Sequence, residues 1–132
     1  MRKNNVDLIR QATQAQAEGD LGPAKDLIAD QAVIHVPRAL EQGDLRGVDG
    51  LATLVLDLLG RTAGTFTSSL IDAIGTGDIV TSLNQVTATR DGQELRYNTV
   101  WTFRFQGDKV VEAWLHPSRP EGEIARFYGF GR

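Results

Sequence analysis

One histidine lies within an apolar segment, and its type suits proton transfer. Residues 32–37 read Ala-Val-Ile-His-Val-Pro, with the imidazole at His35. An imidazole in an apolar setting can accept or donate a proton near neutral pH, so His35 is the leading candidate for an acid–base role. The alternative is a core or cavity-edge histidine that only hydrogen-bonds a neighbour. Strict strand alternation turns His35 away from the face that Val36 occupies, unless a bulge near Pro37 reverses the order.

Asn84 is the second catalytic candidate, because a neutral amide on the inward face of a strand needs a partner. An unpaired buried polar group costs about 1–3 kcal/mol. Asn84 is therefore expected to bind a substrate oxygen or an ordered water. Pairing with Ser82 or Thr99 is the structural alternative.

Further side chains are candidates for contacting a ligand. Tyr97, Thr99 and Trp101 alternate along one face of a β-type run, where the two rings can stack on a flat molecule or simply pack in the core. Arg38 follows the strand-ending proline and can reach the mouth of a hollow, where it would bind a carboxylate or enolate; a solvated arginine is the alternative. His116 is titratable, and its alternative is an interface or supporting role.

The composition excludes several classes of protein. The chain has 132 residues, which predicts one domain over residues 1–132. Its net charge is −3, without a Lys/Arg cluster, so neither nucleic acid nor an anionic membrane is an expected partner. It has no cysteine and two histidines, so we expect no metal site and no cofactor. Without a secretory signal or a run of about 20 apolar residues, a cytoplasmic protein is expected.

Three helices are expected before the main run of strands. Asn4 or Asn5 can cap a first helix that ends near Gly19, and Asp20 can cap a short second helix. Asp49 is expected to cap a third helix, whose stripe of leucines ends at a C-terminal Gly60.

The remaining chain is typical of a β-meander. Strands are predicted at 32–37, 65–74, 79–90, 94–105 and 109–116, with an irregular excursion at 38–48 and a terminal helix at 121–127. Strands this long must twist, so we predict an α+β fold in which a curved sheet wraps around the N-terminal helices. The hollow of such a sheet predicts a site for a small molecule.

Four motifs in this order resemble the SnoaL-like polyketide cyclases and the wider ketosteroid isomerase-like, nuclear-transport-factor-2-like superfamily. They are Gly-Asp-Leu at 19–21, the strand entry at 29–37, Arg-Gly-Val-Asp-Gly-Leu at 46–51 and Gly-Asp-Lys-Val-Val-Glu-Ala-Trp at 107–114. The resemblance covers almost the whole chain and implies a cone-shaped, mixed sheet. It also implies a homodimer through the outer sheet face that carries Trp114, while the face of Ala113 and Leu115 points into the hollow.

The catalytic residues of these relatives are absent from the chain. The carboxylate that serves ketosteroid isomerases as proton shuttle corresponds to Val36, which can contact a ligand but cannot move protons, and their protonated aspartic acid falls near Trp101. The Asp-Arg-Asp set of epoxide hydrolases corresponds to Val86, Asn84 and Leu115. The last-strand aspartate of the cyclases has no counterpart, and His116 is the nearest titratable group.

The sequence favours an enzyme acting on a hydrophobic, oxygenated small molecule of polyketide or terpenoid type. His35 would shuttle a proton during isomerisation or cyclisation, and Asn84, with Tyr97, would hold the oxygen. One alternative is a non-catalytic binding or assembly module, which the missing carboxylates favour. Another is an epoxide-hydrolase-like activity on a water held by His35 and Asn84, which would lack a carboxylate base.

Overall fold

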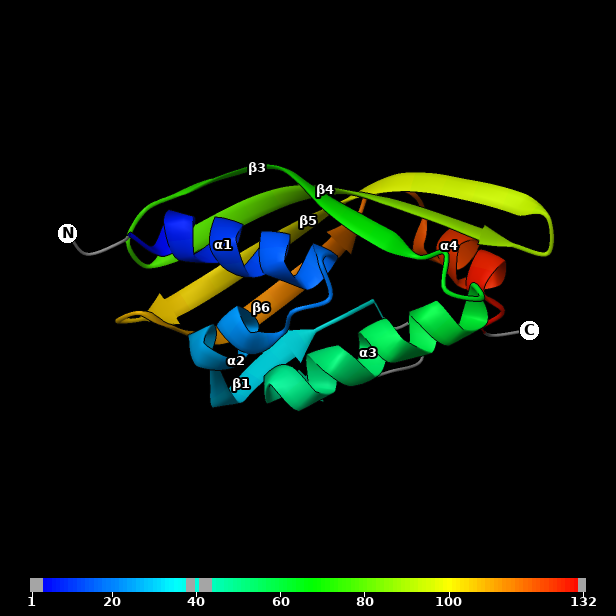
Figure 1. Cartoon of the computed structure of the whole chain (residues 1–132). Helices are drawn as coiled ribbons and strands as arrows, with labels where there is room; N and C mark the ends of the chain where they lie inside the picture. Colours follow the sequence, from blue (N-terminus) through cyan, green and yellow to red (C-terminus); the bar gives the residue numbers. More distant parts are fainter. Residues whose placement is uncertain (1–3, 38–39, 41–43, 131–132) are drawn as a thin grey trace.

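The part of the chain that the structure describes folds into four helices and six strands (Figure 1). The computed structural model describes residues 4–37, 40 and 44–130. In chain order the elements are α1 (Asn5–Ala17), α2 (Gly22–Leu27), β1 (Ile28–His35), β2 (Leu45–Arg46), α3 (Gly47–Arg61), β3 (Thr67–Gly75), β4 (Ile79–Arg90), β5 (Gln93–Gln106), β6 (Lys109–Pro117) and α4 (Glu121–Tyr128).

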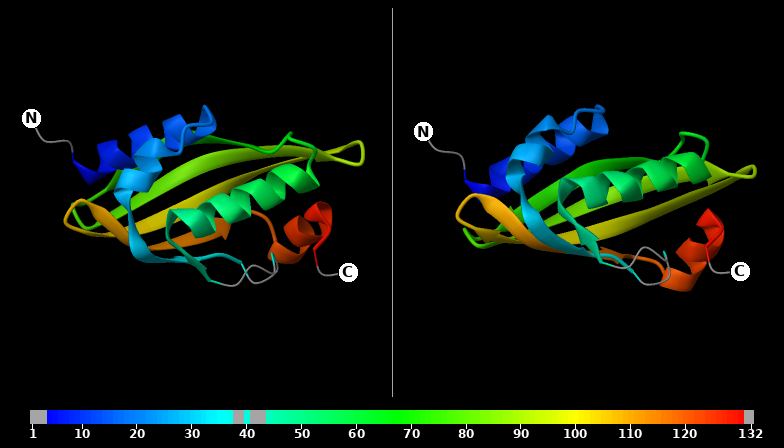
Figure 2. Two further views of the ribbon diagram at one scale, coloured as in Figure 1. Left: turned by 60° about the horizontal axis from the view of Figure 1, so that its bottom comes forward. Right: turned by 90° about the horizontal axis from the view of Figure 1, so that it is seen from below.

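The strands form one open, mixed sheet in the order β2-β1-β6-β5-β4-β3. β1 and β6 are parallel, and the other neighbouring pairs are antiparallel. α1 packs on β3 and α3 packs on β1, so the two helices cover one face of the curved sheet and leave a gap between them (Figure 2). The predicted α+β fold is confirmed, with a sheet that bends around the helices without closing on itself.

Local chemistry fixes the ends of α1. The Asn4 side chain accepts a hydrogen bond from the Asp7 amide at 2.8 Å, which is the predicted N-cap. At the first turn, the Asn5 amide donates to the carbonyl oxygens of Gly77 and Gly107. Both glycines lie in hairpin turns, so Asn5 ties the start of α1 to one end of the sheet.

The third helix begins and ends slightly outside its predicted limits. Gly47, rather than a residue after Asp49, starts α3, and its φ of +61° suits only glycine well. A Cβ there would lie 2.9 Å from the Asp30 carbonyl oxygen, so the close approach of β1 also requires glycine. At the other end Thr62, not Gly60, caps the helix, and its hydroxyl donates to the Leu58 carbonyl at 2.8 Å.

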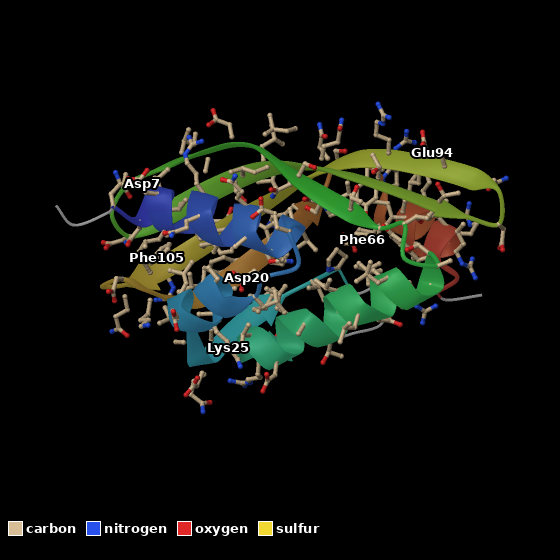
Figure 3. All side chains as sticks on the ribbon, viewed as in Figure 1. Asp7, Asp20, Lys25, Phe66, Glu94 and Phe105 are labelled. Carbon is tan, nitrogen blue, oxygen red and sulfur yellow. The ribbon has the colours of Figure 1, made fainter. Side chains whose placement is uncertain are left out.

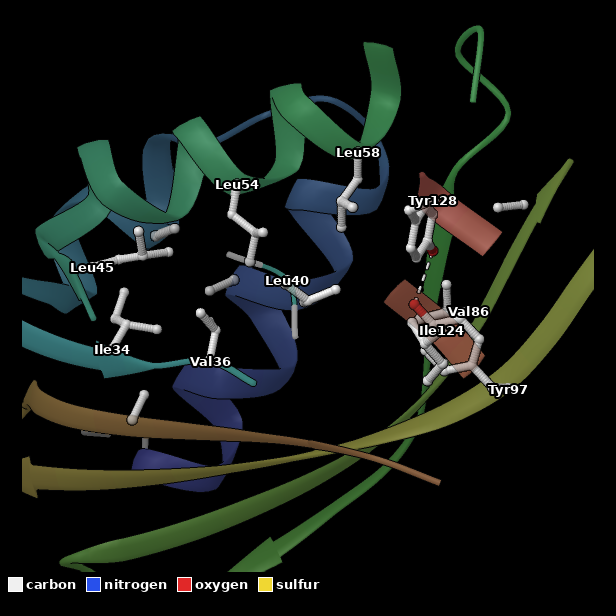
Figure 4. Close-up of a cluster of buried hydrophobic side chains, with 14 of the residues drawn as sticks. Ile34, Val36, Leu40, Leu45, Leu54, Leu58, Val86, Tyr97, Ile124 and Tyr128 are labelled. Atoms are coloured by element: carbon white, nitrogen blue, oxygen red, sulfur yellow. Dashed lines mark hydrogen bonds between the residues drawn. The ribbon is translucent and has the colours of Figure 1, made fainter. Parts of the chain in front are cut away.

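The core lies between the helices and the inner face of the sheet. In Figure 4 Leu54 and Leu58 of α3 face Ile34 and Val36, while Tyr128 of α4 reaches Tyr97 of β5. Figure 3 shows charged side chains around the outside of this layer. No described helix is long and apolar enough to cross a membrane.

Candidate functional site

A hollow of about 550 Å³ opens between α1, α3 and the inner face of the sheet. Ile9 and Ala12 of α1, Val55 of α3 and Ala113 of β6 form part of its apolar wall. A smaller pocket of about 70 Å³ adjoins it and extends toward α4. The two spaces share Gln16, Leu51, Val55, Phe66, Ser68 and Trp101 as lining residues. Their combined lining therefore forms one continuous, mostly apolar surface.

The aromatic residues of β5 line this space without filling it. The rings of Trp101 and Phe103 stack at a centroid distance of 5.7 Å with 12° between their planes, and both residues line the larger hollow. Phe105 is 4% exposed and packs in the core, outside the described lining. An interior blocked by these rings would have left no room for a guest molecule, and the structure shows the opposite.

Asn84 and Thr99 place two neutral polar side chains beside the hollow. They are directly opposite each other on β4 and β5, and they are 2% and 5% exposed. Asn84 lines the larger hollow and Thr99 the smaller pocket. The Asn84 amide nitrogen donates to Ser82 Oγ at 3.2 Å. Asn84 Oδ1 and Thr99 Oγ1 have no hydrogen-bond partner among the described residues.

The smaller pocket contains the titratable side chains of the described lining. Tyr97 and Leu115, both predicted ligand contacts, line it together with Glu121, the first residue of α4. The Tyr97 and Tyr128 hydroxyl oxygens lie 2.8 Å apart in the core (Figure 4). Burial raises the pKa of Tyr97 to about 12 and raises the pKa of Tyr128 as well. Both phenols are therefore neutral at physiological pH.

Glu121 was not singled out from the sequence. The pattern around it predicts only the start of a terminal helix. An acidic residue is common in the first turn of a helix, because the positive end of the helix dipole stabilises its negative charge. No spacing to another polar residue marks it. Only the fold shows that α4 returns to the sheet and brings this carboxylate to the pocket. The described lining of the larger hollow has no Asp, Glu, His, Lys or Arg.

His35 lies on the outer face of the sheet, away from the hollow. Its Nε2 is 2.7 Å from Glu112 Oε2, its Nδ1 is 3.1 Å from Asp44 Oδ1, and its ring stacks on Trp114 at 5.5 Å. The irregularity in β1 lies between Ile28 and Val33, so residues 33–35 alternate regularly and Ile34 takes the inner face. The hypothesis that His35 lies in the hollow as a proton shuttle is therefore wrong.

The charges around His35 stabilise its protonated form. The hydrogen bond to Glu112 raises the pKa of His35, with a smaller contribution from Asp44. The same bond lowers the pKa of Glu112, assisted by Arg104, whose Nη2 donates to Glu112 Oε1 at 3.1 Å. Because His35 and Asn84 lie on opposite faces, they cannot hold one water molecule, as the epoxide-hydrolase alternative required.

The other predicted ligand contacts divide between the lining, the core and the surface. Trp101 lines both spaces, as described above. Val36 is buried in the core cluster and His116 is exposed on the outer face, so neither is part of the described lining. Arg38 lies outside the described residues. Among those residues, no group of three or more His, Cys, Asp or Glu is arranged to hold a metal ion.

A protein-family comparison matches residues 9–113 to the SnoaL-like domain. Among solved structures, Bal32a from a soil-derived mobile gene cassette is 25% identical, with a TM-score of 0.83, covering 94% of this chain and 95% of that one. An NTF2-like protein of unknown function from Burkholderia pseudomallei is 18% identical, with a TM-score of 0.81 and coverages of 97% and 99%. IdmH, a putative polyketide cyclase from Streptomyces antibioticus, is 21% identical, with a TM-score of 0.75 and coverages of 94% and 99%. No curated protein sequence matches the chain.

Proposed function

Since the chain belongs to the SnoaL-like domain family, we propose that it binds a hydrophobic, oxygenated small molecule of polyketide or terpenoid type and promotes its isomerisation or cyclisation. The observation that carries this proposal is the open hollow of about 550 Å³, whose wall is mostly apolar and whose polar side chains are neutral and come mainly from α1, β3 and β4. Ligand sites in proteins have this volume and this balance of apolar wall and sparse polar groups.

The smaller pocket is where a reacting carbon would lie. Glu121 is its carboxylate, and Thr99 and Trp101 share the pocket with it. A carboxylate can take a proton from carbon next to a carbonyl and return it elsewhere, and a nearby hydroxyl can donate to the enolate oxygen that forms. We therefore assign proton transfer to Glu121 instead of His35, while the larger hollow holds the rest of the molecule in a folded conformation.

The proposal is tested with two synthetic substrates. One is a β,γ-unsaturated cyclic ketone, whose conversion to the conjugated enone is followed by ultraviolet absorbance. The other is a linear poly-β-ketone thioester, whose aldol cyclisation is followed by mass spectrometry after chromatography. We expect turnover of at least one substrate above the buffer rate, and an unchanged rate for both would contradict catalysis of these reactions.

Replacing the proposed proton acceptor should slow the reaction without affecting folding. Glu121→Gln is expected to lower kcat by about 100-fold, which is the lower range for removing a general acid or base. Glu94→Gln is the matched control, because Glu94 is exposed near the β4–β5 hairpin and outside the described lining. His35→Gln should also retain full activity. Equal rates for Glu121→Gln and Glu94→Gln would exclude Glu121 from the mechanism.

A non-catalytic binding protein is the second candidate. The observation that favours it is the absence of acidic or basic side chains from the described lining of the larger hollow. A ligand bound only there would contact no acidic or basic side chain that could transfer a proton. Tight binding of both synthetic substrates, recovered unchanged after long incubation, would support this candidate over the enzyme.

The outer sheet face is proposed as the interface of a homodimer. Leu83, Val100 and Trp114 are only partly buried there, and they lie beside Glu112 and Arg104, which carry opposite charges. A two-fold dimer needs a self-complementary patch, and a surface with both charge signs around an apolar centre meets that need.

Light scattering at micromolar concentration tests the dimer. Trp114→Ala is expected to weaken association at least about tenfold, because large aromatic side chains at the centre of an interface contribute most of its binding energy. Trp101→Ala is the matched control, since the second tryptophan lines the hollow on the inner face. A monomeric mass for the unmodified protein would contradict the proposed interface.

A further inference from the structure

Two buried oxygen atoms on the inner face of the sheet lack hydrogen-bond partners, and they belong to neighbouring side chains. Asn84 Oδ1 and Thr99 Oγ1 are the described side-chain atoms in this condition. The residues form a directly opposed pair on β4 and β5, and both side chains line the hollow or its adjoining pocket. Directly opposed Cβ atoms lie about 4.5–5.5 Å apart, so one small polar group can contact both side chains.

The two atoms differ in what they can do. Asn84 Oδ1 only accepts hydrogen bonds, and the amide nitrogen of the same side chain is already used by Ser82 Oγ. Thr99 Oγ1 can donate as well as accept. A single hydroxyl group complements both, because its hydrogen can go to Asn84 Oδ1 while its oxygen accepts from Thr99. An ether or ketone oxygen would complement Thr99 alone.

The surroundings favour a neutral hydroxyl over a charged group. The described lining of the larger hollow contains no Lys, Arg or His that would neutralise a carboxylate, and burying an unpaired charge is costly. A carboxylate would also bring its lone pairs against Asn84 Oδ1. The Trp101 and Phe103 rings, which stack on each other on the same strand as Thr99, make this part of the lining aromatic. A planar ring bearing the hydroxyl would therefore find a matching surface.

We propose that the Asn84–Thr99 pair selects a neutral phenol or enol hydroxyl, carried on a planar ring, as the polar group of the ligand. The proposal rests on the proposed function, because it names the chemical class of molecule that the same hollow takes. It adds that the ligand is uncharged at this position and donates a hydrogen bond there.

Three matched probes separate donor, acceptor and charge on one ring system. 9-Phenanthrol carries the hydroxyl, 9-methoxyphenanthrene keeps the oxygen without its hydrogen, and 9-phenanthrenecarboxylate carries a negative charge. Dissociation constants are measured for each by fluorescence titration. The phenol is expected to bind about tenfold more tightly than the methyl ether, because leaving Asn84 Oδ1 unpaired costs about 1–3 kcal/mol. The carboxylate is expected to bind most weakly.

Variants assign this preference to the pair. Asn84→Leu removes the acceptor that only the phenol uses, so it should reduce the phenol-to-ether ratio toward one without weakening the ether. Thr99→Val removes the donor that both oxygens use, so it should weaken the phenol and the ether alike. Asn98→Leu is the matched control, because it makes the same change on the outer face of β5, where Asn98 is partly buried, and should leave the ratio unchanged. If Asn84→Leu does not fold, as judged by circular dichroism, the parallel weakening of both probes by Thr99→Val, together with the preference of the unmodified protein for the phenol, decides.

The outcomes separate this inference from the proposed function. If none of the three probes binds, ligand binding by the hollow is contradicted. If phenol and ether bind the unmodified protein equally, if Asn84→Leu retains the preference, or if Thr99→Val weakens neither probe, the hollow still binds ligands but this pair does not select them. Tighter binding of the carboxylate would also overturn the inference.

Discussion

The inner and outer faces of the same sheet have opposite chemistry. On the inner face, Asn84 and Thr99 are neutral, buried and incompletely hydrogen-bonded beside an open hollow. On the outer face, His35 and Glu112 are charged or chargeable, partly exposed and hydrogen-bonded to each other. The two sets belong to different strands of one sheet, Asn84 and Thr99 to β4 and β5, His35 and Glu112 to β1 and β6, and the pleat turns them to opposite faces.

This difference teaches that hydrogen-bond satisfaction, more than residue type, distinguishes a candidate binding surface from a structural one. His35 is the residue whose chemistry first suggests catalysis, yet both its nitrogens have partners on the outer face. Asn84 is chemically mild, yet it keeps an unused acceptor next to an empty space. A ligand would gain more from the second arrangement, because an unpaired buried group gains a hydrogen bond without breaking another.

The largest expected effect comes from filling the inner space. Val55 lines both the larger hollow and the smaller pocket. Val55→Trp fills part of this space with an indole and should weaken binding of 9-phenanthrol by about 2–3 kcal/mol, because the ligand and the new side chain would be overpacked. Leu56→Trp is the matched control on the adjacent residue, which is 67% exposed on the far side of α3. Fluorescence titration measures the affinity of each variant for 9-phenanthrol. Equal affinities of the two variants would contradict binding at the inner face.

A smaller effect is expected where the inner face joins α4. Tyr97→Phe leaves the buried Tyr128 hydroxyl without its partner at 2.8 Å, so it should lower the free energy of unfolding by about 1–3 kcal/mol in urea titrations. The double variant with Tyr128→Phe should lose less than the sum of the two single changes, because it leaves no hydroxyl unpaired. Strict additivity would show that the two phenols do not interact.

The smallest effect concerns the outer face and depends on pH. The pKa of His35 is raised by Glu112, so its contribution to stability is full below the ordinary histidine value and is lost as pH rises through the raised pKa. The pKa of Glu112 is lowered, so its contribution is full above the ordinary glutamate value and is lost as pH falls through the lowered pKa. The pair therefore stabilises the fold most between about pH 4.5 and 6.5.

Thermal melting of the unmodified protein and His35→Gln measures this contribution. The difference in melting temperature should be largest near pH 5.5 and should shrink by pH 9, when the imidazole is neutral in both folded and unfolded chains. His116→Gln is the control, because His116 is exposed on the same face. A difference that grows with pH would contradict the ion pair.

The strands and helices were largely predictable because each has a strong local pattern. The strand limits at 79–90 agree with β4, and the alternation of β5 correctly placed Tyr97, Thr99 and Trp101 on one buried or partly buried face. The same alternation left His35 undecided, because one bulge shifts every later residue to the other face. β1 has its irregularity before Val33 rather than near Pro37, and no local pattern distinguishes these positions.

The sequence by itself determined the order of the long elements, the curvature of the sheet, and the apolar character of the surface that lines the hollow. These features follow from residue spacing, which acts over a few neighbours along the chain. Only the tertiary structure decided that the hollow stays open, that His35 turns outward and that Glu121 returns to the pocket on α4. Each of these depends on packing between segments far apart in sequence, where volumes and hydrogen-bond partners are set by the whole fold.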